Sequence, residues 1–141
     1  MIVAIIPARG GSQRIPRKNI KVFCGKPIIG YSIEAAINSG CFDKVIVSTD
    51  DDEISEIAES FGAEVPFVRP TKLSDNFAGT IPVIKHAIEW LDEHTESPLE
   101  VCCLYATAPF VQSDTIKKAY FQWNESQADY CFSVTSFPFP I

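Results

Sequence analysis

The sequence predicts an α/β protein with a mostly parallel sheet and helices on both faces. Short apolar or β-branched runs alternate with segments of helical periodicity, in the order βαβαβ followed by loop–α–β–α–β. The 141 residues contain no repeat, linker or low-complexity tract, so residues 1–141 are expected to form one domain. In sheets of this kind ligands bind at the carboxyl ends of the strands.

The first βαβ unit is marked by residues that begin and end its elements. An apolar run over residues 2–6 predicts a buried strand. Pro27 suits the first turn of a helix and Gly40 suits its end, which predicts a helix over residues 28–39. The β-branched run over residues 44–48 predicts the next strand.

A second helix is expected to begin within residues 50–52, whose acidic side chains suit the helix dipole, and to end at Gly62. Its apolar residues recur at helical spacing: Ile54, Ile57, Ala58 and Phe61. A short strand is expected over residues 64–68, and an irregular polar loop over residues 69–79.

A third helix is expected over residues 81–94, with Thr80 as its cap and Pro82 in its first turn. The residues that define its apolar face are Ile81, Ile84, Ile88 and Leu91. His86 lies two positions off that face and has no second histidine one turn away, so we expect it on the helix surface.

The last part of the chain predicts two further strands and a helix. Residues 99–104 read as a buried strand, and a helix capped by Ser113 or Asp114 runs to about Asn124. Residues 130–135 are expected to form a final strand. The sequence then ends in Ser-Phe-Pro-Phe-Pro-Ile, an apolar stretch with nothing after it to cover it, so we expect the domain to be incomplete at its carboxyl terminus.

Charge is distributed unevenly along the chain. Residues 1–33 contain no acidic residue and six cations: Arg9, Arg14, Arg17, Lys18, Lys21 and Lys26. Residues 34–141 contain the other six cations and all 18 acids, so the two parts carry +6 and −12 and the whole chain −6. The net charge argues against binding to nucleic acid or to a membrane surface, whereas the basic segment predicts a local anion site.

The basic segment follows the first strand directly, from Pro7 onward. Gly10 and Gly11 would let backbone N–H groups approach an anion closely, and the neighbouring cations would neutralise several negative charges. This combination predicts the phosphate site of a protein that handles a nucleoside triphosphate. The loop matches neither G-x-x-x-x-G-K-[ST] nor G-x-G-x-x-G, which disfavours a P-loop hydrolase and a dinucleotide dehydrogenase. A solvated basic loop is the alternative interpretation.

The cysteines are odd in number and include no C-x-x-C pair: Cys24, Cys41, Cys102, Cys103 and Cys131. This pattern predicts reduced, mostly buried thiols rather than a zinc site or a disulfide framework. The chain shows neither a secretory leader pattern nor an apolar run of membrane-spanning length. We therefore expect a cytoplasmic protein.

Several segments together resemble one protein family. They include Ile-Pro-Ala-Arg-Gly-Gly-Ser and Arg-Ile-Pro-Arg-Lys-Asn in the basic loop, and residues 45–51, 62–70, 73–75 and 104–110. The chain is similar, through its whole length and in order, to the acylneuraminate cytidylyltransferases, the CMP-sialic acid synthetase family. Residues 104–110 and 133–141 are most similar to the pseudaminic acid cytidylyltransferase branch.

The resemblance implies a nucleotide-diphospho-sugar transferase type of fold and an enzyme that transfers CMP from CTP to the anomeric hydroxyl of a nine-carbon sugar acid, releasing pyrophosphate. It also implies Mg²⁺, with ligands mainly beyond residue 141, and a homodimer for the full-length protein. Two alternatives remain open. One is CTP-dependent activation of another sugar acid such as N-acetylneuraminate, and the other is a non-catalytic nucleotide-binding fragment.

By position, the resemblance makes Arg9 and Lys18 the catalytic residues, both contacting the triphosphate. The nucleotide-binding set that it implies is Ala8, Arg9, Gly10, Gly11, Ser12, Gln13, Arg14, Lys18, Asn19, Arg69, Ala78 and Thr80. Gln13 stands where many relatives have Lys, so Arg14 could take over one phosphate contact. The members expected to hold cytosine and ribose are Arg69, Ala78 and Thr80.

Several of these side chains have a second interpretation. Arg69 could instead form a surface ion pair. Asp50 and Asp51 could contact a metal or the ribose, or could serve only the amino terminus of the following helix. Thr107 occupies a position at which a related branch, active on an eight-carbon sugar, has a metal-binding Asp. No metal ligand is therefore predicted there, and none elsewhere in this chain.

Overall fold

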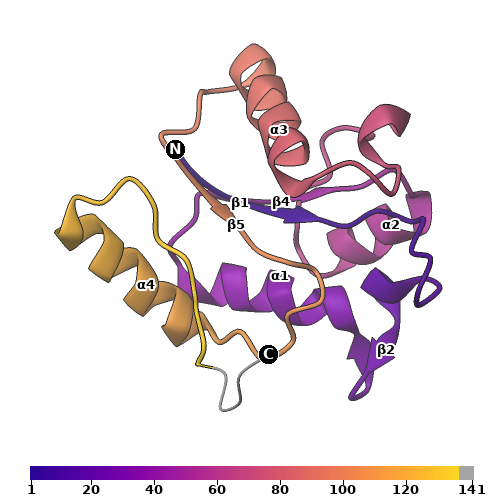
Figure 1. The fold of residues 1–141 in the computed structure, drawn as a ribbon, viewed down its shortest axis with the longest axis horizontal. Helices are drawn as coiled ribbons and strands as arrows, with labels where there is room; N and C mark the ends of the chain where they lie inside the picture. Colours follow the sequence, from indigo (N-terminus) through magenta and orange to yellow (C-terminus); the bar gives the residue numbers. More distant parts are fainter. Residues whose placement is uncertain (137–141) are drawn as a thin grey trace.

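A three-stranded parallel sheet in the order β4-β1-β5 forms the centre of the fold (Figure 1). The computed structural model describes residues 1–136. The strands are β1 (Ile2–Pro7), β4 (Lys44–Ser48) and β5 (Glu100–Cys103). Central β1 pairs Val3 with Lys44 on one side and Ile2 with Glu100 on the other. Because the strands run in the same direction, their carboxyl ends meet at one edge of the sheet.

Helices cover both faces of this sheet, which confirms the predicted class (Figure 1). Helix α3 (Thr80–His94) lies on one face. Helices α1 (Ile28–Ser39) and α2 (Asp52–Ser60) lie on the other, and α4 (Ser113–Ser126) packs beside α1. The predicted bounds of the first helix and of the second strand agree with α1 and β4.

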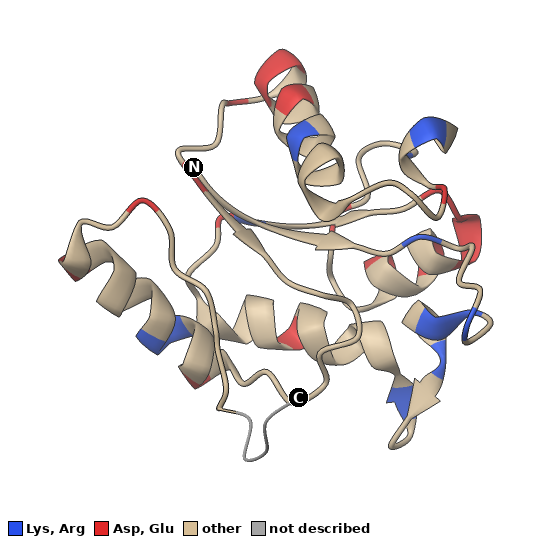
Figure 2. Ribbon diagram, in the orientation of Figure 1, with Lys and Arg blue, Asp and Glu red and all other residues tan. Residues whose placement is uncertain are grey.

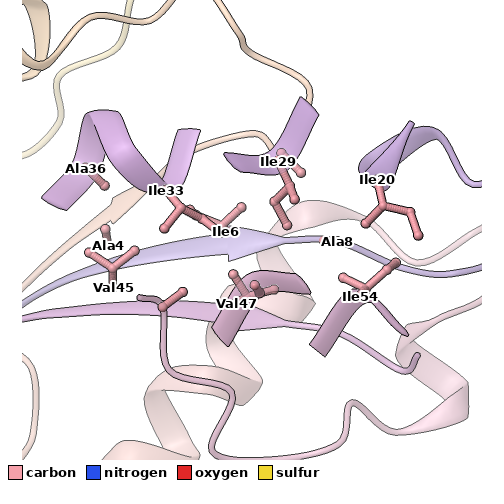
Figure 3. Packing of buried hydrophobic residues seen from close by; sticks show 13 residues of the cluster. Ala4, Ile6, Ala8, Ile20, Ile29, Ile33, Ala36, Val45, Val47 and Ile54 are labelled. Carbon is pink, nitrogen blue, oxygen red and sulfur yellow. The ribbon is translucent and has the colours of Figure 1, made fainter. Parts of the chain in front are cut away.

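Side chains of β1 alternate between two cores because successive residues of a strand point to opposite faces. The core toward α1 and α2 contains Ala4, Ile6, Ala8, Ile29, Ile33, Ala36, Val45, Val47, Ile54 and Ala58 (Figure 3). The core toward α3 contains Val3, Ile5, Ile46, Ala87 and Leu91. Full burial of one such aliphatic side chain stabilises the fold by roughly 1.5–3 kcal/mol, so β1 fixes where its carboxyl-terminal loop begins.

The strand predicted over residues 130–135 is wrong: this segment has no secondary structure. Its aromatic and β-branched side chains are exposed: Tyr130, Phe132 and Val134. Such residues favour a strand only where a neighbouring strand or core receives them, and residues 1–136 offer neither at this place.

The strand predicted over residues 64–68 is reduced to two isolated parallel bridges to the β4 segment. These join Ile46 to Glu64 and Thr49 to Val68. Pro66 lies between the bridges and has no backbone N–H to donate, which interrupts the hydrogen-bond ladder. The segment nevertheless follows β4 and delivers residue 69 to the carboxyl edge of the sheet.

Helix α3 packs on the core with most of the predicted apolar face: Leu91 is buried and Ile84 and Ile88 are partly buried against the same cluster, but Ile81 is not part of it. Ile81 is 80% exposed, and the buried residues are Val83, Ala87 and Leu91. Thr80 is the first helical residue and Gly79 is the N-cap, so the prediction of Thr80 as the cap is wrong. His86 is half-buried rather than on the surface, with its ring centroid 4.9 Å from that of Phe67, and burial lowers its pKa.

Short elements that the sequence did not reveal connect the larger ones. Between β1 and α1 lie a 3₁₀ turn, η1 (Lys18–Ile20), and a small hairpin of β2 (Val22–Phe23) and β3 (Lys26–Pro27). The hairpin turns through Cys24 and Gly25, which have φ angles of 46° and 92°. A second 3₁₀ turn, η2 (Thr71–Leu73), lies in the loop before α3.

All five cysteines are free thiols. The prediction that they are mostly buried is wrong, because Cys24, Cys103 and Cys131 are exposed. Cys102 is more enclosed, and burial raises its pKa to about 11. No helix within residues 1–136 is long and apolar enough to cross a bilayer. The apolar end, residues 137–141, lies outside the described residues.

Candidate functional site

A pocket of about 160 Å³ opens at the carboxyl edge of the sheet. Three segments from distant parts of the sequence form its walls: the loop after β1, the segment that leads into α3, and the loop after β5. The residues that line it are Pro7, Arg9, Ser12, Lys18, Asn19, Arg69, Ala78, Gly79, Thr80, Val83, Tyr105, Ala106 and Thr107. Figure 2 shows Lys and Arg gathered around the loop after β1 and the hairpin that follows it.

The pocket collects part of the predicted nucleotide-binding set. Its members in the lining are Arg9, Ser12, Lys18, Asn19, Arg69, Ala78 and Thr80. The members outside the lining are Ala8, Gly10, Gly11, Gln13 and Arg14. Ala8 is fully buried in the core toward α1, whereas Gln13 and Arg14 are exposed to solvent.

The loop after β1 is held in shape by its own polar contacts. The Asn19 side chain donates from Nδ2 to the carbonyl of Arg9 over 2.9 Å, and Asn19 is itself buried. The Gly10 N–H donates to Oδ1 of Asp50 over 2.9 Å, so this amide already has a protein acceptor. A Cβ at Gly10 would lie 2.5 Å from Oδ2 of Asp51, so a side chain there would displace the carboxylate.

Arg17 does not face the pocket but binds the start of α2. Its guanidinium donates to both carboxylate oxygens of Asp51, over 2.8 Å to Oδ1, and also to Glu53. Asp51 is the N-cap of α2 and accepts from the Ile54 N–H over 3.0 Å. The hydrogen bond from Arg17 holds the pKa of Asp51 below its usual value, and the pKa of Arg17 is raised in turn. Of the two interpretations of Asp51, this geometry favours the helix-terminus role.

Arg69 is the buried cation of the site, only 4% exposed. Its Nε donates to Oγ of Ser48 over 3.0 Å, and a terminal nitrogen donates to the Ser48 carbonyl. Within residues 1–136 no carboxylate forms an ion pair with it, so the alternative of a surface ion pair is wrong. Burial lowers its pKa to about 10, which leaves it charged at neutral pH. A buried positive charge without a carboxylate partner favours an anionic ligand.

The loop after β5 supplies the wall that the sequence analysis missed. The Tyr105 carbonyl accepts from Oγ of buried Ser32 over 2.8 Å, which anchors this loop to α1. The Tyr105 hydroxyl lies 3.4 Å from Oγ1 of Thr80, so the pair spans the wall between α3 and β5. Tyr105 directly follows the strand predicted over residues 99–104, and ligands bind where such strands end. Its place in the sequence could therefore have indicated that it lines the pocket.

A second hollow of about 300 Å³ lies between the start of α2 and residues 65–68. Its lining includes Asp51 and Asp52 and no Lys or Arg. An anion would meet carboxylates there, so the pocket with Arg9, Lys18 and Arg69 is the better candidate for a phosphate compound.

The described residues do not form a metal site by themselves. Within residues 1–136 no group of three or more His, Cys, Asp or Glu side chains is arranged to hold an ion. Asp51 is occupied by Arg17, and Asp50 accepts from Gly10. Neutralisation of a bound anion by these residues therefore falls to the cationic side chains.

Comparison with known proteins identifies the family of the chain. A family model described as cytidylyltransferase matches residues 3–137. The chain belongs to the cytidylyltransferase family. The predicted family and fold class are thereby confirmed.

Two curated relatives illustrate the range of the family. The chain is 52% identical over 139 residues to a pseudaminic acid cytidylyltransferase of Campylobacter jejuni, covering 99% of this chain and 60% of that protein. It is 41% identical over 118 residues to an N-acylneuraminate cytidylyltransferase of Escherichia coli, covering 84% of this chain and 27% of that protein. The chain thus spans less than two thirds of the length of either relative.

A solved structure supports the same fold. The CMP:2-keto-3-deoxy-manno-octonic acid synthetase complexed with CTP superposes with a TM-score of 0.69 at 25% identity, covering 90% of this chain and 48% of that one. A cytidylyltransferase from Leptospira borgpetersenii gives a TM-score of 0.68 at 22% identity, with 89% of this chain and 50% of that chain covered, and shows the fold alone.

Proposed function

We propose that residues 1–141 bind CTP for an enzyme that transfers CMP to the anomeric hydroxyl of a nine-carbon sugar acid, pseudaminic acid. The observation that carries this proposal is that buried Arg69, which forms no ion pair within residues 1–136, lies in one pocket with Arg9 and Lys18. The choice of sugar rests on the 52% identity to a pseudaminic acid cytidylyltransferase.

In this proposal the triphosphate lies along the loop after β1. Arg9 and Lys18 contact the phosphates, and Ser12 and Asn19 add polar groups from the same wall. Arg69, Ala78 and Thr80 form the opposite wall and hold the nucleoside. The N–H of Gly10 donates to Asp50 and is not free to bind a phosphate. Gly10 contributes instead because it has no side chain, which lets the loop pass close to Asp51.

The reaction joins the anomeric oxygen to the α-phosphorus of CTP. The bond between that phosphorus and the oxygen bridging to the β-phosphate breaks, and pyrophosphate leaves with the electron pair while the sugar hydroxyl releases its proton to water. Such a transfer depends mainly on positioning and on neutralising charge. Arg9 and Lys18 supply positive charge for that purpose at the triphosphate, and buried Arg69 adds a third positive charge from the nucleoside wall.

Mg²⁺ would add further neutralisation of phosphate charge in an enzyme of this kind. Residues 1–136 hold no ready site for it, and no step above depends on it. The expectations that its ligands lie beyond residue 141, that the full-length protein is a homodimer and that it is cytoplasmic remain predictions.

Calorimetric titration of the chain with CTP, UTP and ATP tests the nucleotide assignment. We expect saturable binding of CTP and binding of UTP and ATP at least about tenfold weaker, because a pocket with directional polar groups discriminates between bases. Lys18→Ala should weaken CTP binding by more than about tenfold. Lys21→Ala is the matched control, since Lys21 is exposed and outside the pocket.

Pyrophosphate release with CTP and either pseudaminic acid or N-acetylneuraminate tests the reaction and the sugar. Turnover only with pseudaminic acid supports the proposal, whereas preference for N-acetylneuraminate overturns the choice of sugar. CTP binding without turnover is the result expected of a nucleotide-binding fragment. Equal binding of all three nucleotides would reduce the site to a general phosphate loop.

A further inference from the structure

The two walls of the pocket are joined by one residue that the predicted site does not include, Asp75. It lies between η2 and α3, in the loop that leads to Ala78 and Thr80. We infer that Asp75 is a positioning residue that couples the triphosphate cation Arg9 to the nucleoside wall. The inference rests on the proposed function, because it assumes that one ligand touches both walls.

Asp75 makes this connection through its backbone and its side chain separately. Its carbonyl accepts from the Arg9 guanidinium, across 66 positions of sequence. Its Oδ1 accepts from the N–H of Phe77 over 2.8 Å and from the N–H of Ala78 over 2.7 Å. The first contact reaches the phosphate wall, and the other two fix the backbone of the nucleoside wall.

Apolar packing does not hold this part of the loop. The Phe77 side chain is 95% exposed and Asp75 is exposed as well. The preceding turn is closed separately, with the Leu73 N–H bound to the Pro70 carbonyl and the Ser74 N–H to that of Thr71. The bonds at Asp75 are therefore the ones that place Ala78 relative to Arg9.

Arg9 can keep its bond to Asp75 while it binds a phosphate. A guanidinium has five N–H donors, and the contact with Asp75 uses a single terminal nitrogen. The two walls of the pocket are then held at a fixed spacing before a ligand with both a triphosphate and a nucleoside binds. Without the Asp75 side chain, the loop between η2 and α3 would have to become ordered when CTP binds, and this entropy cost would weaken CTP binding.

The test compares CTP with its two halves. Asp75→Ala removes the acceptor, and Asp75→Asn retains an oxygen that can accept from both N–H groups. Asp129→Ala is the matched control, because Asp129 is exposed and lies outside the pocket. Calorimetry would measure the binding of CTP, CMP and inorganic tripolyphosphate to each variant, with thermal melting to confirm that each is folded.

We expect Asp75→Ala to weaken CTP binding about tenfold while tripolyphosphate and CMP change less than about twofold. Asp75→Asn and Asp129→Ala should bind CTP within about twofold of the unaltered chain. In the Arg9→Ala background, Asp75→Ala should weaken CTP binding less than it does in the unaltered chain, because the loop that the side chain orders no longer has Arg9 bound to its carbonyl.

Other results would overturn the inference. Unchanged CTP binding by Asp75→Ala, in a chain that binds CTP, rejects the coupling and leaves the proposed function intact. If Asp75→Ala weakens tripolyphosphate binding as much as CTP binding, Asp75 only supports Arg9 and the coupling is rejected. If Asp75→Asn binds CTP as weakly as Asp75→Ala, the role of the acceptor oxygen is rejected. A chain that binds no CTP overturns the proposed function and the coupling together.

Discussion

Arg17 and Arg69 are both near the carboxyl edge of the sheet, yet their surroundings differ in kind. Arg17 is half-exposed and is saturated by the carboxylates of Asp51 and Glu53. Arg69 is buried, its guanidinium donates to the hydroxyl and carbonyl of Ser48, and within residues 1–136 it forms no ion pair with a carboxylate. An arginine whose charge is satisfied by acids stabilises the protein. One that is buried without them retains charge for a ligand.

The same division runs through the loop after β1. Arg9 and Lys18 line the pocket, whereas Arg17 points to the start of α2. The loop therefore has a side that lines the pocket and a side that binds the start of α2, separated by only a few residues. Residue type alone does not distinguish them, and the partner of each cation does.

The largest effect should come from removing Arg69, the buried cation in the pocket lining. Arg69→Met should weaken CTP binding by about a hundredfold, because a charge-assisted contact in a buried site is lost. The melting temperature should fall only modestly, because Oγ of buried Ser48 loses its donor while the Ser48 carbonyl keeps the N–H of Ala8. Calorimetry with CTP and a thermal melt of the same sample check both parts. A variant that melts much earlier would instead assign Arg69 a structural role.

The next effect concerns Gly10, where the two sides of the loop meet. Gly10→Ala places a Cβ 2.5 Å from Oδ2 of Asp51, which is held by Arg17 and by the Ile54 N–H. Because that carboxylate cannot move without breaking these bonds, we expect a loss of about 1–3 kcal/mol in unfolding free energy. Urea unfolding measures it.

Gly11→Ala provides the control for this stability measurement. A Cβ at Gly11 would meet nothing within 4 Å. Its unfolding free energy should therefore stay within about 0.5 kcal/mol of the unaltered chain. Equal destabilisation by the two substitutions would show that the contact with Asp51 is not the reason for glycine at position 10.

How far these differences could be read from the sequence depends on the range of the interactions. Strand and helix positions such as residues 28–39 and 44–48 follow from local periodicity and capping, and they agree with α1 and β4. The clustering of cations in the first 33 residues also indicates an anion site without any structure. Local pattern and charge were enough for the fold class and for the general place of the pocket.

What the sequence could not give were partners far apart in the chain. Arg17 and Asp51 are separated by 34 positions, and Arg9 and Asp75 by 66. The exposed segment over residues 130–135 has the composition of a strand, but a strand also requires a neighbour. In each case the deciding contact is tertiary, and local propensity carries no information about it.

A smaller effect is expected from the structural cation, with the opposite signature to Arg69. Arg17→Met should lower the unfolding free energy by about 1 kcal/mol, a value suited to a partly exposed ion pair at a helix cap. CTP affinity should change less than about threefold, because Arg17 is outside the pocket. Urea unfolding and calorimetry on matched samples compare the two methionine variants directly. A loss of CTP binding as large as that of Arg69→Met would remove the distinction between the two sides of the loop.

The smallest effect is the acid dependence of the Arg17–Asp51 pair. The pKa of Asp51 in the folded chain is lower than its usual 3.8, and the largest cause is the hydrogen bond from Arg17. Burial acts in the opposite direction, and the hydrogen bond from the N–H of Ile54 lowers the pKa further. A carboxyl whose folded pKa is depressed stabilises the fold above its unfolded pKa, and this stabilisation disappears as the pH falls through the folded value.

The stability advantage of the unaltered chain over Asp51→Asn should therefore be constant above about pH 5 and shrink as the pH falls below 3.8. Arg17→Met should show a weaker dependence in the same range, because the Ile54 N–H still favours the ionised cap. Urea unfolding between pH 3 and pH 7 measures all three chains. An advantage over Asp51→Asn that persists unchanged at pH 3 would mean that ionisation of Asp51 contributes nothing, and that the cap acts through its hydrogen bond alone.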